Sequence, residues 1–287
     1  SVRSELNNGR ILPGDALPIE STPRPPRQEL VVALESLSPL LLAWVVCVIL
    51  VAGLLQGALG FGFPFVATPL IALASDIRTA IVLVLLPTLA TICVALFTSG
   101  PLRATLVRFW MMPLYMILGA AVGTWVFVSA PDAPYTLVLS LLTLIYLGLD
   151  RLGRTEWAVV RRNERAFAPL SGLAAGIFEG TANIAAPPLI ILYLSLSLTP
   201  AMLVQALNIC FLVGKTTQFT VLTFYGGVGM SEWLATLPLV AIGVAGSFTG
   251  VRIRNRIDAV TFRIWVKRAL FVIALALLGQ YAWSLFA

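Results

Sequence analysis

The chain has 287 residues, of which 59% are hydrophobic and 11% are charged, with a net charge of +6 and a mean hydropathy of +0.95. Soluble domains carry about 25% charged residues, so this composition excludes an ordinary soluble protein and predicts an all-α, polytopic membrane protein. The absence of histidine excludes His-ligated zinc and His-dependent catalysis, and the three cysteines lie isolated within apolar segments, so no metal site and no cofactor are expected.

The first 36 residues differ in composition from the rest of the chain. The stretch "ILPGDALPIESTPRPPRQEL" (11–30) is rich in proline and polar residues and has no apolar run to bury. Such a composition cannot form a packed core. We therefore expect a flexible tail over 1–36.

Two apolar segments are interrupted by residues that do not favour a continuous helix. The first interruption is "GFGFP" (Gly60 to Pro64) and the second is "EGTAN" (Glu179 to Asn183). The short pieces around them span about 15–17 Å at 1.5 Å per residue, roughly half of a ~30 Å hydrocarbon core. Each interrupted segment thus predicts a broken helical hairpin, with helices over 37–59, 64–73, 168–178 and 185–194.

Three longer helices are expected after each hairpin, over 79–97, 109–128, 135–149, 200–224, 233–251 and 261–286. Glycines and prolines recur in the same order through the two halves: Gly53 aligns with Gly172, and Pro69 aligns with Pro188. This order predicts a duplicated unit, with one repeat over 37–150 and a second over 167–287. The spacing Gly-x-x-x-Gly also recurs, and we expect these glycines to be helix contacts. They are Gly119, Gly123, Gly246 and Gly250.

Most of the 19 Lys and Arg residues lie in three segments, near 103–108, 151–165 and 252–268. By the positive-inside rule these segments are expected in the cytoplasm, including the basic linker 151–166, which places the N-terminus outside. All three can share one side only if the two repeats have opposite orientations. Inverted repeats with broken helices that meet near the midplane are a recurring transporter design.

Two charged residues are expected deep in the membrane, Glu179 and Lys215. Each costs on the order of 3 kcal/mol at the bilayer centre, so neither should face lipid. Gln205, Asn208 and Gln218 fall on the same helical face as Lys215. Two interpretations stay open: a buried Glu179–Lys215 pair that only joins helices, or a site in which Lys215 binds an anion and Glu179 couples or gates transport.

The interruptions add further candidates for this site. A helix N-terminus presents unpaired N–H groups and suits an anion, so two inverted hairpins could direct two N-termini at one site. Thr181 and Asn183 could cap the helix or contact the ligand. Glycines permit close approach of the backbone. The remaining candidates are Gln56, Gly60, Gly62 and Gly180.

Three stretches resemble the sulfite exporter TauE/SafE family: "LLQGALGFGFPFVATPLIAL" (54–73), "GIFEGTANIAAPPLIILYL" (176–194) and "QALNICFLVGKTTQ" (205–218). The resemblance implies a transporter for sulfur-containing or organic anions, such as sulfite or sulfoacetate, in a bacterial inner membrane. It places the glycine-rich motif of that family, and its second-half counterpart, on Gly57, Gly60, Gly62, Pro69, Gly176, Gly180, Pro187 and Pro188. Many members have three glycines where this chain has Gly60-Phe61-Gly62, which leaves the substrate open.

The function expected from these observations is secondary transport, in the export direction, of a small organic or sulfur-containing anion by alternating access, with proton coupling as an option. A carboxylate permease and a non-transporting membrane subunit are the alternatives. With one carboxylate at depth and no histidine, the chain is not expected to be an enzyme. The expected partners are the small anion and the lipid bilayer, with a homodimer as a further option. Nucleic acid is not expected, because the arginines lie in loops without interleaved aromatic residues.

Overall fold

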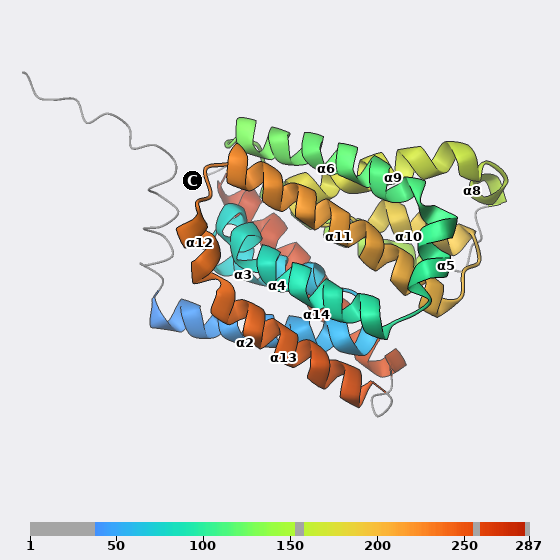
Figure 1. Ribbon diagram of the computed structural model, residues 1–287. Coiled ribbons are helices and arrows are strands. Elements are labelled where there is room, and N and C mark those ends of the chain that lie inside the picture. Colours follow the sequence, from blue (N-terminus) through green and yellow to red (C-terminus); the bar gives the residue numbers. More distant parts are fainter. Residues whose placement is uncertain (1–37, 153–157, 255–258, 285–287) are drawn as a thin grey trace, which may run out of the picture.

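The computed structural model describes residues 38–152, 158–254 and 259–284, which form helices joined by short turns (Figure 1). The predicted tail over 1–36 lies outside the described residues. The helices are α2 (Pro39–Leu59), α3 (Phe63–Ala74), α4 (Ile77–Thr98), α5 (Leu102–Phe109), α6 (Met111–Ser129), α7 (Tyr135–Leu152), α8 (Ala158–Arg162), α9 (Glu164–Ala182), α10 (Ala186–Ser195), α11 (Pro200–Phe224), α12 (Met230–Ala235), α13 (Leu237–Ile253) and α14 (Ala259–Ser284). This arrangement confirms the all-α class.

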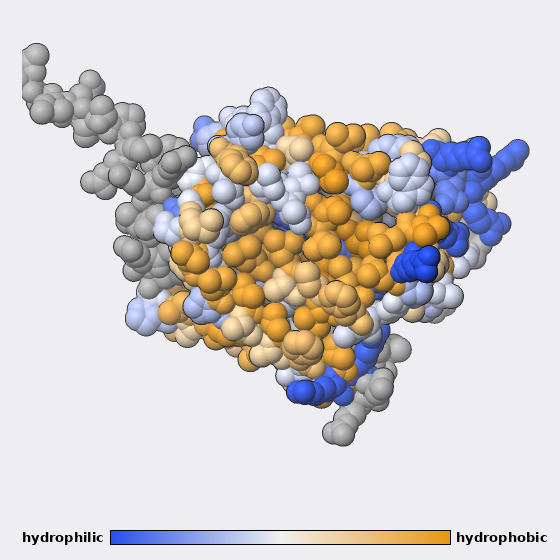
Figure 2. All heavy atoms as spheres, in the orientation of Figure 1, coloured by the Kyte–Doolittle hydropathy of each residue, from blue (hydrophilic) through white to orange (hydrophobic). Residues whose placement is uncertain are grey.

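The surface of the helices is apolar, as a membrane protein requires. Among the described residues, four helical spans are long and apolar enough to cross a bilayer: Pro39–Leu59, Ile77–Thr98, Met111–Ser129 and Met230–Ile253. On α6 the outward side chains are large and hydrophobic, with Leu118 58% and Trp125 60% exposed. Figure 2 shows an apolar surface over most of the visible face. The chain is therefore a polytopic helical membrane protein.

The first helix break lies where the sequence predicts it. Helix α2 ends at Leu59, and Gly60 and Gly62 have φ angles of +83° and +120°. Side chains with a Cβ rarely adopt these angles, so the two glycines let the chain reverse. Helix α3 then begins at Phe63, with Pro64 in its first turn, where a missing N–H costs little.

The second break is shorter and later than predicted, which is a correction to the expected half-helix over 168–178. Helix α9 continues through Gly180 to Ala182, so Glu179 lies inside the last turn of a helix and not within the break. The turn is made at Asn183, which has a φ angle of +63° and whose backbone N–H donates to the carbonyl of Glu179 in the last turn of α9. Asparagine tolerates this left-handed conformation better than most side chains do.

Three shorter helices were not predicted, namely α5, α8 and α12. The expected helix over 109–128 is α6, which begins at Met111 directly after α5 ends, whereas the expected helix over 233–251 is divided at Thr236. Proline explains both boundaries, because Pro113 and Pro238 have no N–H to donate to the carbonyl four residues earlier. Helix α8 lies within the predicted linker over 151–166, and α9 begins there as well.

The helices of the two predicted repeats pack reciprocally. Helix α2 packs along α13 and α9 packs along α6, while α4 contacts α11 and α7 contacts α14. The Gly-x-x-x-Gly glycines lie in these contacts: a Cβ at Gly119 or Gly123 would meet the α9 backbone, and one at Gly246 or Gly250 would meet the α2 backbone. Their expected role in helix packing is confirmed. The exchange of partners fits an inverted duplication, which stays a prediction.

Arg-bearing segments gather at one end of the molecule. Figures 1 and 2 show α5, α8 and the C-terminal end of α13 at this end, where the surface is hydrophilic. Exposed residues there include Arg103, Arg161 and Arg252. The three segments thus lie on a common side, and its identity as the cytoplasmic side stays a prediction.

We expect Gly176→Ala to destabilise the protein through the contact between α9 and α6. A Cβ at Gly176 would lie 2.5 Å from the backbone atoms Ala120 N and Met116 O, which cannot move without separating the helices. Overpacking of this kind costs about 1–3 kcal/mol. The measurement is the apparent melting temperature in detergent. Gly148→Ala on α7 is the matched control, since a Cβ there meets no atom within 4 Å. Equal melting temperatures for the two variants would contradict the close contact.

Candidate functional site

Helix α11 carries four buried polar side chains along its length. Gln205, Asn208, Lys215 and Gln218 are each 0% exposed. The helix has 25 residues, begins at Pro200 after the capping side chain of Thr199, and packs against both α4 and α6. The polar side chains expected on one face are therefore enclosed by protein.

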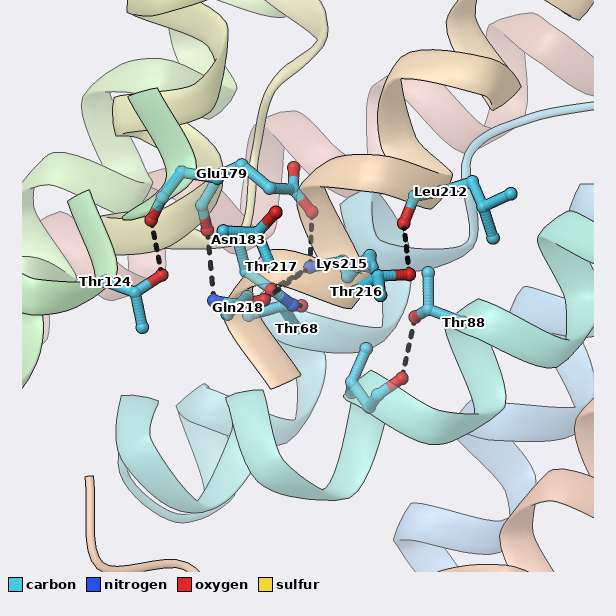
Figure 3. Close-up of polar contacts among 12 residues, drawn as sticks. Thr68, Thr88, Thr124, Glu179, Asn183, Leu212, Lys215, Thr216, Thr217 and Gln218 are labelled. Carbon is cyan, nitrogen blue, oxygen red and sulfur yellow. Dashed lines mark hydrogen bonds and ion pairs between the residues drawn. The ribbon is translucent and has the colours of Figure 1, made fainter. Parts of the chain in front are cut away.

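The ammonium group of Lys215 is surrounded by three oxygen atoms from α11 and the end of α9. Its Nζ lies 2.5 Å from Glu179 Oε1 and donates to Gln218 Oε1 at 3.1 Å. It also donates to Asn183 Oδ1. Figure 3 shows these side chains converging on Lys215. An ammonium group has three hydrogens to donate, and three acceptor oxygens lie around this one.

A second layer of contacts fixes these acceptors. Gln218 Nε2 donates to the backbone carbonyl of Glu179 at 3.1 Å, and Asn183 Nδ2 donates to Thr68 Oγ1 at 2.7 Å. Thr68 belongs to α3, so this bond connects the first hairpin to the break of the second. Sequence reasoning missed Thr68, because a threonine in an apolar helix usually bonds the carbonyl four residues earlier and gives no signal of its own.

The first break is held by two amide side chains. Gln56 Oε1 accepts from the backbone N–H of Phe63 at 3.0 Å, and Gln56 Nε2 donates to Asn208 Oδ1 at 3.1 Å. Asn208 Nδ2 in turn donates to the carbonyl of Gly60 at 2.7 Å and to that of Val204 at 2.8 Å. The same helix, α11, therefore contacts the first break through Asn208 and the second break through Lys215.

The other predicted site residues lie away from Lys215 or make local contacts. Thr181 Oγ1 donates to Ile177 O within α9 at 2.8 Å, and Gln205 Nε2 donates to Leu96 O on α4 at 3.0 Å. Gly180 faces the backbone of α6, where a Cβ would clash. Gly62 serves the turn between α2 and α3.

The helix N-termini at the two breaks offer few donors for a ligand. In α10 the residues after Ala186 are Pro187 and Pro188, neither of which has an N–H. In α3 the first N–H, on Phe63, already donates to Gln56. Positive charge at this site thus comes mainly from Lys215.

The Lys215–Glu179 pair is buried in a place where either charge alone would be unfavourable. The side chains are 0% and 1% exposed. Removing one partner of such a pair leaves a charge that neither water nor protein neutralises. This geometry is compatible with two roles. Another anion can replace the Glu179 carboxylate beside Lys215, or the pair can serve only to hold α9 against α11. Within the described residues, no group of three or more His, Cys, Asp or Glu side chains could hold a metal ion.

Comparison of the chain with known proteins gives one family. Curated proteins and solved structures yield no match. The family model described as sulfite exporter TauE/SafE matches residues 45–277, which include both helix breaks and all of α11. The match covers most of the chain and confirms the resemblance seen in its motifs. The chain belongs to the sulfite exporter TauE/SafE family.

Proposed function

We propose that this protein is a secondary transporter that exports a small organic or sulfur-containing anion, such as sulfite, sulfoacetate or another sulfonate, by alternating access. Family membership supports a membrane transporter of sulfite or a related anion. We further propose that it lies in a bacterial inner membrane, with the Arg-rich segments in the cytoplasm and the N-terminus outside.

The observation that carries this proposal is the position of Lys215. Its ammonium group is fully buried, and it lies where α11 meets the break between α9 and α10. A lysine at membrane depth is a functional residue by default, because its insertion is unfavourable unless it has a polar partner. In the proposed site Lys215 supplies the positive charge, and Gln218 and Asn183 supply hydrogen-bonding groups beside it.

The two breaks give this site a way to face either side of the membrane. Both hairpins are attached to α11 through side-chain hydrogen bonds, the first at Asn208 and the second at Gln218. Movement of one hairpin relative to α11 would open one side of Lys215 while the other stays closed. A fully buried Lys215, with 0% of its surface exposed, is what a conformation closed to both sides would present.

One observation favours the second candidate, a carboxylate permease of the same fold. The Glu179 carboxylate lies 2.5 Å from Lys215 Nζ, so a carboxylate fits the space beside the ammonium group. A sulfonate presents the same kind of oxygen acceptor with one more oxygen atom. Both classes of anion therefore belong in the test.

Thermal unfolding of the detergent-solubilised protein tests this function. A ligand that binds the folded state raises the apparent melting temperature. We expect a selective increase with at least one of sulfite, sulfoacetate, taurine, isethionate, lactate or sulfate, and we expect Lys215→Met to abolish that increase. If no anion stabilises the protein, or if the Lys215 variant responds as the wild type does, the proposed site is wrong.

A further inference from the structure

The position that a bound anion would take beside Lys215 is already held by Glu179. Its Oε1 lies 2.5 Å from the ammonium nitrogen, and the remaining two donor directions of Lys215 end on Gln218 and Asn183. An incoming anion must therefore displace the glutamate from Lys215. Figure 3 shows the Glu179 carboxylate directed at the ammonium group of Lys215.

Once the anion has displaced it from Lys215, the Glu179 carboxylate is a second negative charge in a buried site. The Glu179 side chain is 1% exposed, and a Cβ placed on Gly214 of α11 would lie 3.3 Å from its Cγ, so little water can reach the carboxylate. A buried carboxylate without a positive partner takes up a proton in preference to staying ionised. Binding of an anion at Lys215 and protonation of Glu179 are thus linked.

The neighbouring helices supply one positive charge at the carboxylate. The described titratable or charged side chains on the elements packed against α9 are Tyr115, Tyr135, Arg161, Arg162, Tyr193, Cys210 and Lys215. Lys215 contacts the carboxylate, Tyr193 instead contacts Cys210, and Arg161 and Arg162 belong to α8, at the other end of α9.

We propose that Glu179 takes up one proton for each monovalent anion that binds Lys215, so that the site carries a monoanion and a proton together with no net charge. This inference rests on the proposed function, in which Lys215 is the anion site. In the cycle, a proton from the open side binds the Glu179 carboxylate and the anion replaces it beside Lys215. Both leave on the other side, and the Lys215–Glu179 pair forms again.

The charge balance defines the class of substrate. One lysine neutralises one negative charge, so the site suits isethionate, lactate or hydrogensulfite. Among the anions of the proposed function, the inference therefore favours monoanions over sulfoacetate, because a dianion such as sulfoacetate or sulfate would leave one negative charge uncompensated in a buried site. Transport of a monoanion with a proton is electroneutral, so it follows the anion and proton gradients and not the membrane potential.

Calorimetric titration of the detergent-solubilised full chain tests the proposal, with isethionate and lactate as monoanion probes, because neither changes its charge between pH 6 and 8. Linkage of one proton to one anion makes the affinity fall about tenfold for each unit increase in pH. Repeating the titration in buffers of different ionisation enthalpy should show uptake of about one proton per anion. In Glu179→Gln, which has no carboxylate to protonate, the affinity should be independent of pH and higher than that of the wild type at pH 8.

The outcomes separate this inference from the function on which it rests. If the probes bind through Lys215 but with an affinity independent of pH, the proton link is wrong while the anion site stands. If Lys215→Met binds the probes as the wild type does, the site itself is wrong. Failure of both probes to bind Glu179→Gln would overturn the inference, since that variant lacks the internal competitor. Binding of sulfoacetate at pH 8 as tight as that of isethionate would overturn the charge limit.

Discussion

Lys215→Met is expected to abolish anion flux in proteoliposomes. Methionine preserves much of the length and apolar surface of the lysine side chain but removes the ammonium group, which contacts Glu179, Asn183 and Gln218. Without that charge the buried site has no group that offsets the desolvation of an anion. The measurement is flux of the anion that stabilises the wild type. Thr216→Val is the matched control, because the Thr216 hydroxyl is exposed and bonds Leu212 O in its own helix.

Loss of flux must be separated from loss of folding, because the single variant leaves Glu179 without its partner. Breaking a buried ion pair in this way costs about 3–5 kcal/mol when the remaining charge stays ionised. In the double variant Glu179→Gln/Lys215→Met both charges are gone, so the apparent melting temperature should return toward that of the wild type. Flux should remain absent. Flux at the wild-type level in either variant would remove Lys215 from the mechanism.

The burial of Lys215 and Glu179 within the protein could be predicted from the sequence because a charge that faces lipid is so unfavourable. A lysine in an apolar helix must face protein, and Lys215 and Glu179 do contact each other. Hydropathy also predicted the long helices, and Gly60 and Gly62 marked the first break. These predictions hold because each depends on a strong local preference of the chain.

The details of the site depend on how the helices pack against one another, and the sequence indicates that packing only weakly. Glycine and threonine at positions 180 and 181 suggested a loop, but contact with α6 keeps them helical, and the left-handed residue Asn183 decides where α9 ends. The polar face of α11 was recognised as one surface. Asn208 contacts the first break and Lys215 contacts the second. This division depends on where the two hairpins pack against α11.

Asn183 is the second residue at which we expect a large loss of affinity. Its Oδ1 accepts from Lys215, and its Nδ2 donates to Thr68 Oγ1, so it fixes the ammonium group relative to both hairpins. A hydrogen bond to a charged group contributes about 1.5–3 kcal/mol, which corresponds to a loss of affinity of roughly 10- to 150-fold in Asn183→Gly. Asn183→Ala should lose the same affinity and also stability, by about 1–2 kcal/mol, because alanine is strained at a φ angle of +63°.

Asn183→Asp distinguishes a role in anion binding from a structural role. Aspartate keeps an acceptor for Lys215 and an acceptor for the Thr68 hydroxyl, so the contacts that hold the break together remain. It also adds a second negative charge beside one lysine, which disfavours any further anion at the same place. The expected result is loss of anion binding in a calorimetric titration carried out below the melting temperature of the variant, which should itself be lower than that of the wild type because the added charge is buried beside a single lysine. A variant that binds the anion as tightly as the wild type would show that the anion lies elsewhere, and the buried pair would then serve only to join α9 to α11.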